Sequence, residues 1–163
     1  MPANNTRTLC LTAVFMAIIC VATMSVQIPI PLGYAHLGDC MVLLSALCLD
    51  TRQAVLASAL GSMLADFITG FIIWCAPTFI IKGCMVLILA YVRQRTGKLL
   101  PGAVLALLFM TAGYTLTGAL LYGGLAVGLA STPGLLLKSA LNLALFLFLA
   151  KYLAPFIRKQ SGE

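Results

Sequence analysis

Four charged side chains lie inside apolar stretches of this sequence, at positions where a charge is costly. They are two acids and two bases, Asp39, Asp66, Lys82 and Lys138. A charge in hydrocarbon costs at least about 2.5–3.5 kcal/mol, so such residues are expected to pair with one another or to line a polar cavity. One interpretation is therefore a set of salt bridges that only join helices. The other is a polar pocket for a small solute, open to one side of the membrane.

Other side chains near these charges favour the pocket. Five residues at comparable depth could donate or accept hydrogen bonds, and they are Ser62, Thr69, Thr78, Ser139 and Asn142. The single histidine, His36, and Tyr34 stand just before the apolar run that contains Asp39. Taken alone, His36 is more typical of a capping or surface residue than of a ligand-binding one. Tyr34 and Trp74 also fit an aromatic belt at the membrane surface.

The composition indicates a protein embedded in a membrane. Of its 163 residues, 62% are hydrophobic and 9% are charged, whereas soluble domains carry about 25% charged residues. One membrane-spanning helix needs about 20 apolar residues, so the length allows about six spans and leaves almost nothing for a soluble domain. We expect an all-α integral membrane protein with six transmembrane helices in a single bundle over residues 1–163. The apolar runs place these helices near residues 8–26, 35–50, 53–72, 77–93, 100–123 and 134–154.

The basic residues give this bundle an orientation. The turns at 27–33, 71–77 and 123–134 contain no lysine or arginine. Eight of the ten basic residues fall in the other turns or near the termini: Arg7, Arg52, Arg93, Arg95, Lys98, Lys151, Arg158 and Lys159. By the positive-inside rule, both termini are cytoplasmic and the three uncharged turns face outward. Lys82 and Lys138 are the exceptions, each expected about 6–8 Å below the outer helix ends, with Asp66 at a similar depth.

Several classes of function find no support in the sequence. The nucleotide-binding pattern GxxxxGK[ST] is absent, and one histidine cannot build a multi-histidine metal site. The six cysteines form no CxxC pair and mostly lie in apolar runs, where cysteine packs as a small hydrophobic residue. The net charge of +6 forms no basic stripe with interleaved aromatics, so no nucleic-acid partner is expected. We therefore expect no cofactor, no metal and no enzymatic activity.

Small residues mark places where helices can approach closely. In the first helix they are Ala13 and Ala17. The third predicted helix carries two ridges of small residues, which are Ala54, Ser58 and Ser62 on one, and Ala57, Gly61 and Ala65 on the other. Such spacing serves packing within a bundle or docking of another subunit.

Three stretches resemble the S components of energy-coupling factor (ECF) vitamin transporters. They are GYAHLGDCMVLLSALCLD (33–50), ASALGSMLADFITG (57–70) and WCAPTFIIKGCMVLILAYV (74–92). The resemblance extends over about residues 8 to 98 by motif, and over the whole chain by length and topology. It is greatest to the branch that takes up hydroxymethylpyrimidine and pyridoxine.

This resemblance implies a multi-pass subunit of the plasma membrane that captures a small vitamin or vitamin precursor from outside. The three outward turns would cover the pocket, and the face with Ala13 and Ala17 would dock on a membrane-embedded coupling (T) protein. Two ATPase subunits bound to that protein would supply the energy. The expected substrate-binding residues are Tyr34, His36, Asp39, Asp66, Trp74, Thr78, Lys82, Lys138 and Asn142.

Two other functions remain open from the sequence. A self-sufficient carrier could use protonation of Asp66 as a driving step, but such carriers usually contain internal repeats, and none is evident between residues 1–80 and 81–163. A small intramembrane enzyme would make the charged residues catalytic. No nucleophile with an adjacent base, and no set of metal ligands, supports that reading.

Overall fold

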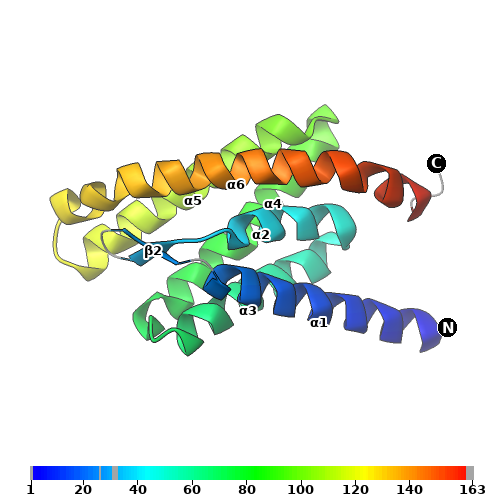
Figure 1. Cartoon of the computed structure of the whole chain (residues 1–163), viewed down its shortest axis with the longest axis horizontal. Coiled ribbons are helices and arrows are strands. Elements are labelled where there is room, and N and C mark those ends of the chain that lie inside the picture. The colour runs from blue at the N-terminus through cyan, green and yellow to red at the C-terminus, as the bar shows by residue number, and fades with distance from the viewer. Residues whose placement is uncertain (1, 26, 31–32, 161–163) are drawn as a thin grey trace.

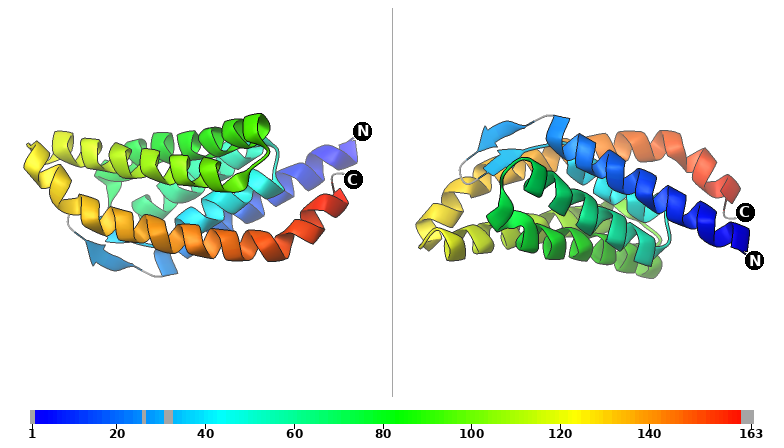
Figure 2. Two further views of the ribbon diagram at one scale, coloured as in Figure 1. Left: turned by 90° about the horizontal axis from the view of Figure 1, so that it is seen from above. Right: turned by 90° about the horizontal axis from the view of Figure 1, so that it is seen from below.

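The computed structural model describes residues 2–25, 27–30 and 33–160 and is almost entirely helical. The chain folds into one elongated bundle in which α1 begins and α6 ends at the same end (Figures 1 and 2). The elements of the described residues are α1 (Pro2–Ser25), β1 (Ile28–Ile30), β2 (Gly33–Ala35), α2 (Gly38–Cys48), α3 (Thr51–Ile68), the 3-10 helix η1 (Ile72–Trp74), α4 (Cys75–Thr96), α5 (Leu99–Leu121) and α6 (Leu125–Gln160).

Four of the helical segments are long and apolar enough to cross a membrane. They are Thr6–Ser25, Ile72–Thr96, Leu99–Leu121 and Leu125–Tyr152. Helix α2 has only 11 residues, which span about 16 Å against a hydrocarbon core of about 30 Å. The described residues thus give a membrane-protein fold with six α-helices. That all six cross the membrane, and that both termini are cytoplasmic, stay predictions.

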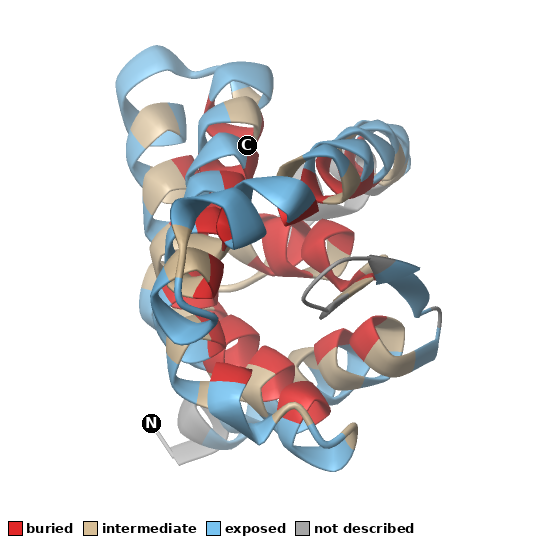
Figure 3. Ribbon diagram, turned by 90° about the vertical axis from the view of Figure 1, so that its left-hand side faces the viewer, coloured by how far each residue is buried: buried red, intermediate tan, exposed pale blue. Residues whose placement is uncertain are grey.

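Short helix α2 lies at the centre of the bundle. It packs against α1, α3, α4 and α6, and its Cys40, Val42 and Leu43 are fully buried. Figure 3 shows buried residues on the facing sides of the helices and exposed residues around the outside. A charged side chain at the start of α2 is therefore surrounded by protein on all sides.

Helices α1 and α3 approach closely through the small residues of α3. All six residues of the two ridges are buried. A Cβ atom built at Gly61 would lie 2.6 Å from the carbonyl oxygen of Met16 in α1. Any side chain at position 61 would push the two backbones apart, so this ridge serves packing within the bundle.

The turn predicted at 27–33 leads into a β-hairpin, which the sequence did not predict. Strands β1 and β2 pair antiparallel, with Pro29 opposite Tyr34, and both pack against α6. The next helix starts at Gly38 instead of near residue 35, because Tyr34 and Ala35 belong to β2. Residues 31–32 of the predicted turn lie outside the described residues.

The expected long turn at 123–134 is wrong, because α6 already begins at Leu125. A Cβ atom at Gly128 would lie 2.4 Å from the carbonyl oxygen of Thr115 in α5, and the hydroxyls of Thr115 and Thr132 lie 3.0 Å apart. This close packing on α5 keeps the segment helical even though it contains Pro133.

The new boundaries also change the predicted depths of the charges. Lys138 lies 13 residues from the start of α6 (138 − 125), about 20 Å along the helix and not 6–8 Å. Lys82 lies 7 residues from the start of α4 (82 − 75), about 10 Å along it. Asp66 is only two residues from the end of α3 (68 − 66), about 3 Å along it.

Candidate functional site

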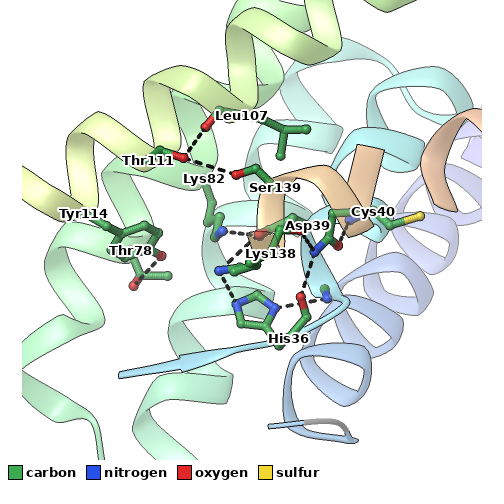
Figure 4. A network of polar contacts seen from close by, with 12 residues as sticks. His36, Asp39, Cys40, Thr78, Lys82, Leu107, Thr111, Tyr114, Lys138 and Ser139 are labelled. Atoms are coloured by element: carbon green, nitrogen blue, oxygen red, sulfur yellow. Dashed lines mark hydrogen bonds and ion pairs between the residues drawn. The ribbon is translucent and has the colours of Figure 1, made fainter. Parts of the chain in front are cut away.

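Three of the four predicted charges meet in one buried cluster. Asp39, in the first turn of α2, forms ion pairs with Lys82 of α4 through Oδ1 and with Lys138 of α6 through Oδ2, the latter at 3.1 Å. The side chain of Asp39 is 0% exposed, that of Lys82 is 1% exposed and that of Lys138 is 3% exposed. Figure 4 shows both lysines pointing at the carboxylate. The predicted pairing of acids with bases is confirmed for these residues, which we call the charged cluster.

His36 is the fourth member of the site. Its Nδ1 accepts the backbone N–H of Gly38 at 3.0 Å, and its Nε2 lies 3.0 Å from Nζ of Lys138. The side chain is buried, so His36 is not a surface residue. Its bond to the N–H of Gly38, the first residue of α2, agrees with the capping interpretation. Burial, with the nearby Lys138 as the next cause, holds the pKa of His36 well below its ordinary value. The imidazole is therefore neutral at pH 7.

Gly38 is required by this arrangement. A Cβ atom at position 38 would lie 2.1 Å from Oγ1 of Thr23 and 2.9 Å from Nδ1 of His36. A side chain there would break the hydrogen bond that orients the imidazole. The glycine in the sequence HLGD thus places both His36 and Asp39.

Asn142 holds the start of α2 against α6. Its Oδ1 accepts the N–H of Cys40 at 2.8 Å, and its Nδ2 donates to the carbonyl oxygens of His36 and Lys138 at 2.8 and 2.9 Å. Backbone groups therefore occupy the amide that was expected to bond a ligand. Asn142 is a positioning residue in this structure.

Asp66 and Tyr34 form a second polar contact, separate from the charged cluster. The Tyr34 hydroxyl donates to Oδ1 of Asp66 at 2.8 Å, and its ring packs against Phe71 at a centroid distance of 5.0 Å. Among the described residues Asp66 forms no ion pair with a lysine. This contact joins the hairpin to the end of α3.

An aromatic wall lies beside the charged cluster. Trp74 is buried, and its ring centroid lies 5.7 Å from that of Tyr114 and 6.2 Å from that of Tyr122. Both lysine Nζ atoms lie over the Tyr114 ring, Lys82 at 5.2 Å and Lys138 at 5.4 Å from its centroid. Burial of Trp74 excludes the aromatic-belt interpretation for this residue.

The aromatic wall also carries three hydrogen-bonding groups. The hydroxyls of Thr78 and Tyr114 lie 3.0 Å apart. Nε1 of Trp74 is buried and has no hydrogen-bond partner among the described residues. An indole N–H is a donor that usually finds a partner when buried, so this group is an unsatisfied donor in the described structure.

Sequence reasoning missed Tyr114, which connects the wall to the charged cluster. A signal was present, because Thr111, Tyr114 and Thr115 interrupt an otherwise apolar run at spacings that share one helix face. The hydroxyl of Thr111 bonds that of Ser139 on α6 at 3.1 Å. This stripe faces the interior because α5 packs on α6 along it.

The arrangement offers aromatic faces and hydrogen-bonding groups. A flat ring could pack on Trp74 and Tyr114, while the lysines and the carboxylate exchange hydrogen bonds with its substituents. Within the described residues no group of three His, Cys, Asp or Glu side chains could hold a metal ion. The site contains no nucleophile paired with a base.

Comparison with known families decides the class of protein. The family model described as the S component of an ECF-type riboflavin transporter matches residues 3–155. The chain belongs to this family. It is therefore a substrate-binding S component of an ECF transporter and not an enzyme. Such S components pair with a T component and ATPases.

Two individual proteins are similar to the chain. A protein of Pyrococcus woesei described as "Uncharacterized protein in gap 3'region" is 38% identical to the chain over 108 residues. The match covers 63% of this chain and 72% of that protein. The chain also matches the fold in "Structure and mechanism of the S component of a bacterial ECF transporter" with a TM-score of 0.78 at 18% identity, over 94% of this chain and 99% of that one. The resemblance to S components is thus confirmed, whereas the match is to a riboflavin-type family and not to the expected pyridoxine branch.

Proposed function

We propose that this S component captures a small heteroaromatic vitamin or precursor, of the pyridoxine or hydroxymethylpyrimidine type, at the aromatic wall above the charged cluster. The observation that carries the proposal is the unpartnered indole N–H of Trp74 in a wall that both buried lysines also face. A ring stacked there would receive hydrogen bonds along its edge and packing on its face. The family name makes riboflavin the competing ligand.

The hairpin would act as the cover of this site. Tyr34 of β2 reaches Asp66 of α3, and His36, just after the hairpin, contacts Lys138 of α6. These two contacts tie the first outward turn to opposite sides of the bundle. Their release would open the site to the outside, and their formation would enclose the substrate.

A binding panel tests the proposal. We expect the purified full chain to bind pyridoxine, hydroxymethylpyrimidine or riboflavin in titration calorimetry. Tyr114→Leu should weaken binding at least tenfold, equivalent to about 1.4 kcal/mol. Tyr91→Leu is the matched control, because Tyr91 is 60% exposed on α4. Equal affinities in the two variants would place the ligand elsewhere, and no binding by any compound would reject the proposed substrate class.

The proposal includes the membrane orientation and the partners. With the termini in the cytoplasm of a plasma-membrane protein, the hairpin faces outward, and α1 presents an exposed apolar face to a T component that carries two ATPases. Ala13 and Ala17 are exposed on this face, and Val14, Ile18 and Val21 beside them are 52%, 42% and 61% exposed. Small residues between larger apolar ones allow a partner helix to approach closely.

Bulky substitutions on α1 test the docking surface. We expect Ala13→Phe and Ala17→Phe to bind substrate normally and to lose uptake when the chain is produced with its coupling module. Ala112→Phe is the matched control, because Ala112 is exposed on α5. Uptake that survives both α1 substitutions would reject this face as the docking site.

A further inference from the structure

Acidic and basic side chains balance inside the bundle. The buried charged residues are the acids Asp39 and Asp66 and the bases Lys82 and Lys138. The other charged residues whose side chains the structure describes are all exposed. His36 adds no charge, because its imidazole is neutral. The interior therefore holds two negative and two positive charges, and a proton that passes from one of these groups to another leaves their sum at zero.

Asp66 belongs to this balance although it forms no ion pair among the described residues. Its carboxylate accepts a hydrogen bond from the Tyr34 hydroxyl at 2.8 Å. The electrostatic fields of Lys82 and Lys138 both reach Asp66, and that of Asp66 reaches Lys138 in return. Buried charges act on one another beyond contact distance, because little water screens them. Asp66 therefore compensates the lysine charge that Asp39, as a single carboxylate, leaves over.

Both ammonium groups already face a carboxylate. Lys82 binds Oδ1 of Asp39, and Nζ of Lys138 lies 3.1 Å from Oδ2 of the same residue. Figure 4 shows both lysines directed at this one group. A charged substituent placed here would add a charge that no group of the interior compensates. Such a charge is costly in a buried site, so the balance disfavours anions and cations alike.

The unsatisfied groups on either side of Tyr114 suit an uncharged ring. Among the described residues, Nε1 of Trp74 is a buried donor without an acceptor, and Oδ2 of Asp39 receives no hydrogen bond although Lys138 pairs with it by charge. The Tyr114 ring lies between them, because its centroid is 5.7 Å from that of Trp74 and 5.4 Å from Nζ of Lys138. A ring with a carbonyl oxygen or ring nitrogen, and with an O–H or N–H group, offers a partner to each and adds no charge.

We propose that this site selects substrates without net charge and rejects the acidic, cationic and phosphorylated forms of the same ring. The inference rests on the proposed function and narrows its substrate class. Pyridoxine, hydroxymethylpyrimidine and riboflavin carry no net charge in mildly alkaline solution and remain candidates. Pantothenate, an anion, and thiamine, a cation, are excluded, because each brings a charge that the two buried acids and two buried bases do not compensate.

Probes that share a ring and differ in charge test the selection. They are pyridoxine with pyridoxamine and 4-pyridoxate, riboflavin with its phosphate, and hydroxymethylpyrimidine with its phosphate. Titration calorimetry of the full chain at pH 8 gives an affinity for each. For a ring that binds, we expect the uncharged form to bind at least about a hundredfold more tightly than its charged forms, equivalent to about 2.8 kcal/mol. A charged form that binds as tightly as the uncharged one overturns this inference and leaves the vitamin-capture function standing.

Two charge variants separate the effect of charge from that of size. Asp66→Asn leaves one excess positive charge in the interior and should raise the affinity for an anionic form, relative to the uncharged form, by about tenfold or more. Lys138→Met leaves one excess negative charge and should move this ratio in the opposite direction. Asp50→Asn, exposed between α2 and α3, is the matched control and should leave the ratio unchanged.

The outcomes separate the two proposals. A ratio that neither charge variant moves would mean that size or shape excludes the charged forms, which overturns this inference and leaves vitamin capture standing. Failure of every probe to bind rejects the proposed substrate class, and this inference with it.

Discussion

Replacing Asp39 with asparagine removes the carboxylate that balances the buried ammonium of Lys82. The two side chains are 0% and 1% exposed, so water cannot solvate the lysine after the substitution. Asparagine keeps the volume of aspartate and offers a neutral oxygen. The variant therefore measures the charge alone, with little change in packing.

The structure sets the expected size of the effect. Removing one partner of a fully buried ion pair costs about 3–5 kcal/mol, because it leaves the other charge uncompensated. In a protein of this length, each kcal/mol lowers the melting temperature by about 2–4 °C. We therefore expect Asp39→Asn to lower the melting temperature by about 6–20 °C.

The assay is thermal unfolding of the purified chain in detergent, followed by the fluorescence of Trp74, its single tryptophan. The double variant Asp39→Asn/Lys82→Met removes both charges and should recover more than half of the loss. Asp50→Asn is the matched control, because Asp50 is exposed between α2 and α3, and it should change stability by less than about 0.5 kcal/mol. A single variant that melts like the wild type, or a double variant no better than the single one, would refute this reasoning.

Two further predictions use other parts of the structure. Gly61→Ala should destabilise the protein by about 1–3 kcal/mol through overpacking, because its Cβ would lie 2.6 Å from the Met16 oxygen, whereas Gly83→Ala, with 3.5 Å to its nearest neighbour, should be tolerated in the same melting assay. Because burial lowers the pKa of His36, the unfolded chain binds a proton there below about pH 6.5 that the folded chain does not. Stability should rise with pH up to that value, and melting curves from pH 5 to 8 should show this slope reduced in His36→Gln; an unchanged slope would mean that His36 is not buried in its neutral form.

Much of the fold was accessible from the sequence because lipid imposes a simple rule. Long apolar runs must form helices, since backbone groups cannot stay unpaired in hydrocarbon. The helices over 77–93 and 100–123 were accordingly placed within a few residues of α4 and α5. This rule does not predict the hairpin, because its strands of three residues are too short to give a periodic pattern.

The predicted start of α6 was wrong because the prediction followed the local glycine and proline signals and could not take account of packing on α5. The segment from Gly123 to Gly134 contains four glycines and a proline, which normally mark a loop. In the structure Gly128 serves as a close-packing surface against α5. This role of Gly128 depends on where α5 lies in the fold, and that position cannot be read from a single sequence.

The free-energy cost of burying charges predicted that a charged cluster would form. It did not predict which residues would contact one another. Buried charges had to meet, and Asp39, Lys82 and Lys138 do so. That Asp66 would bond Tyr34 instead depends on the hairpin. The use of Asn142 as a backbone clamp depends likewise on how α2 enters the bundle.

The central claim is that the chain captures a vitamin at the aromatic wall and the charged cluster. The most direct test is native mass spectrometry of the chain purified from cells grown in rich medium. The account predicts a bound small molecule of vitamin mass in the wild type, and its loss in Tyr114→Leu but not in Tyr91→Leu. A wild-type protein that carries no such mass and gains none from a vitamin panel, or a ligand that both variants retain equally, would contradict it.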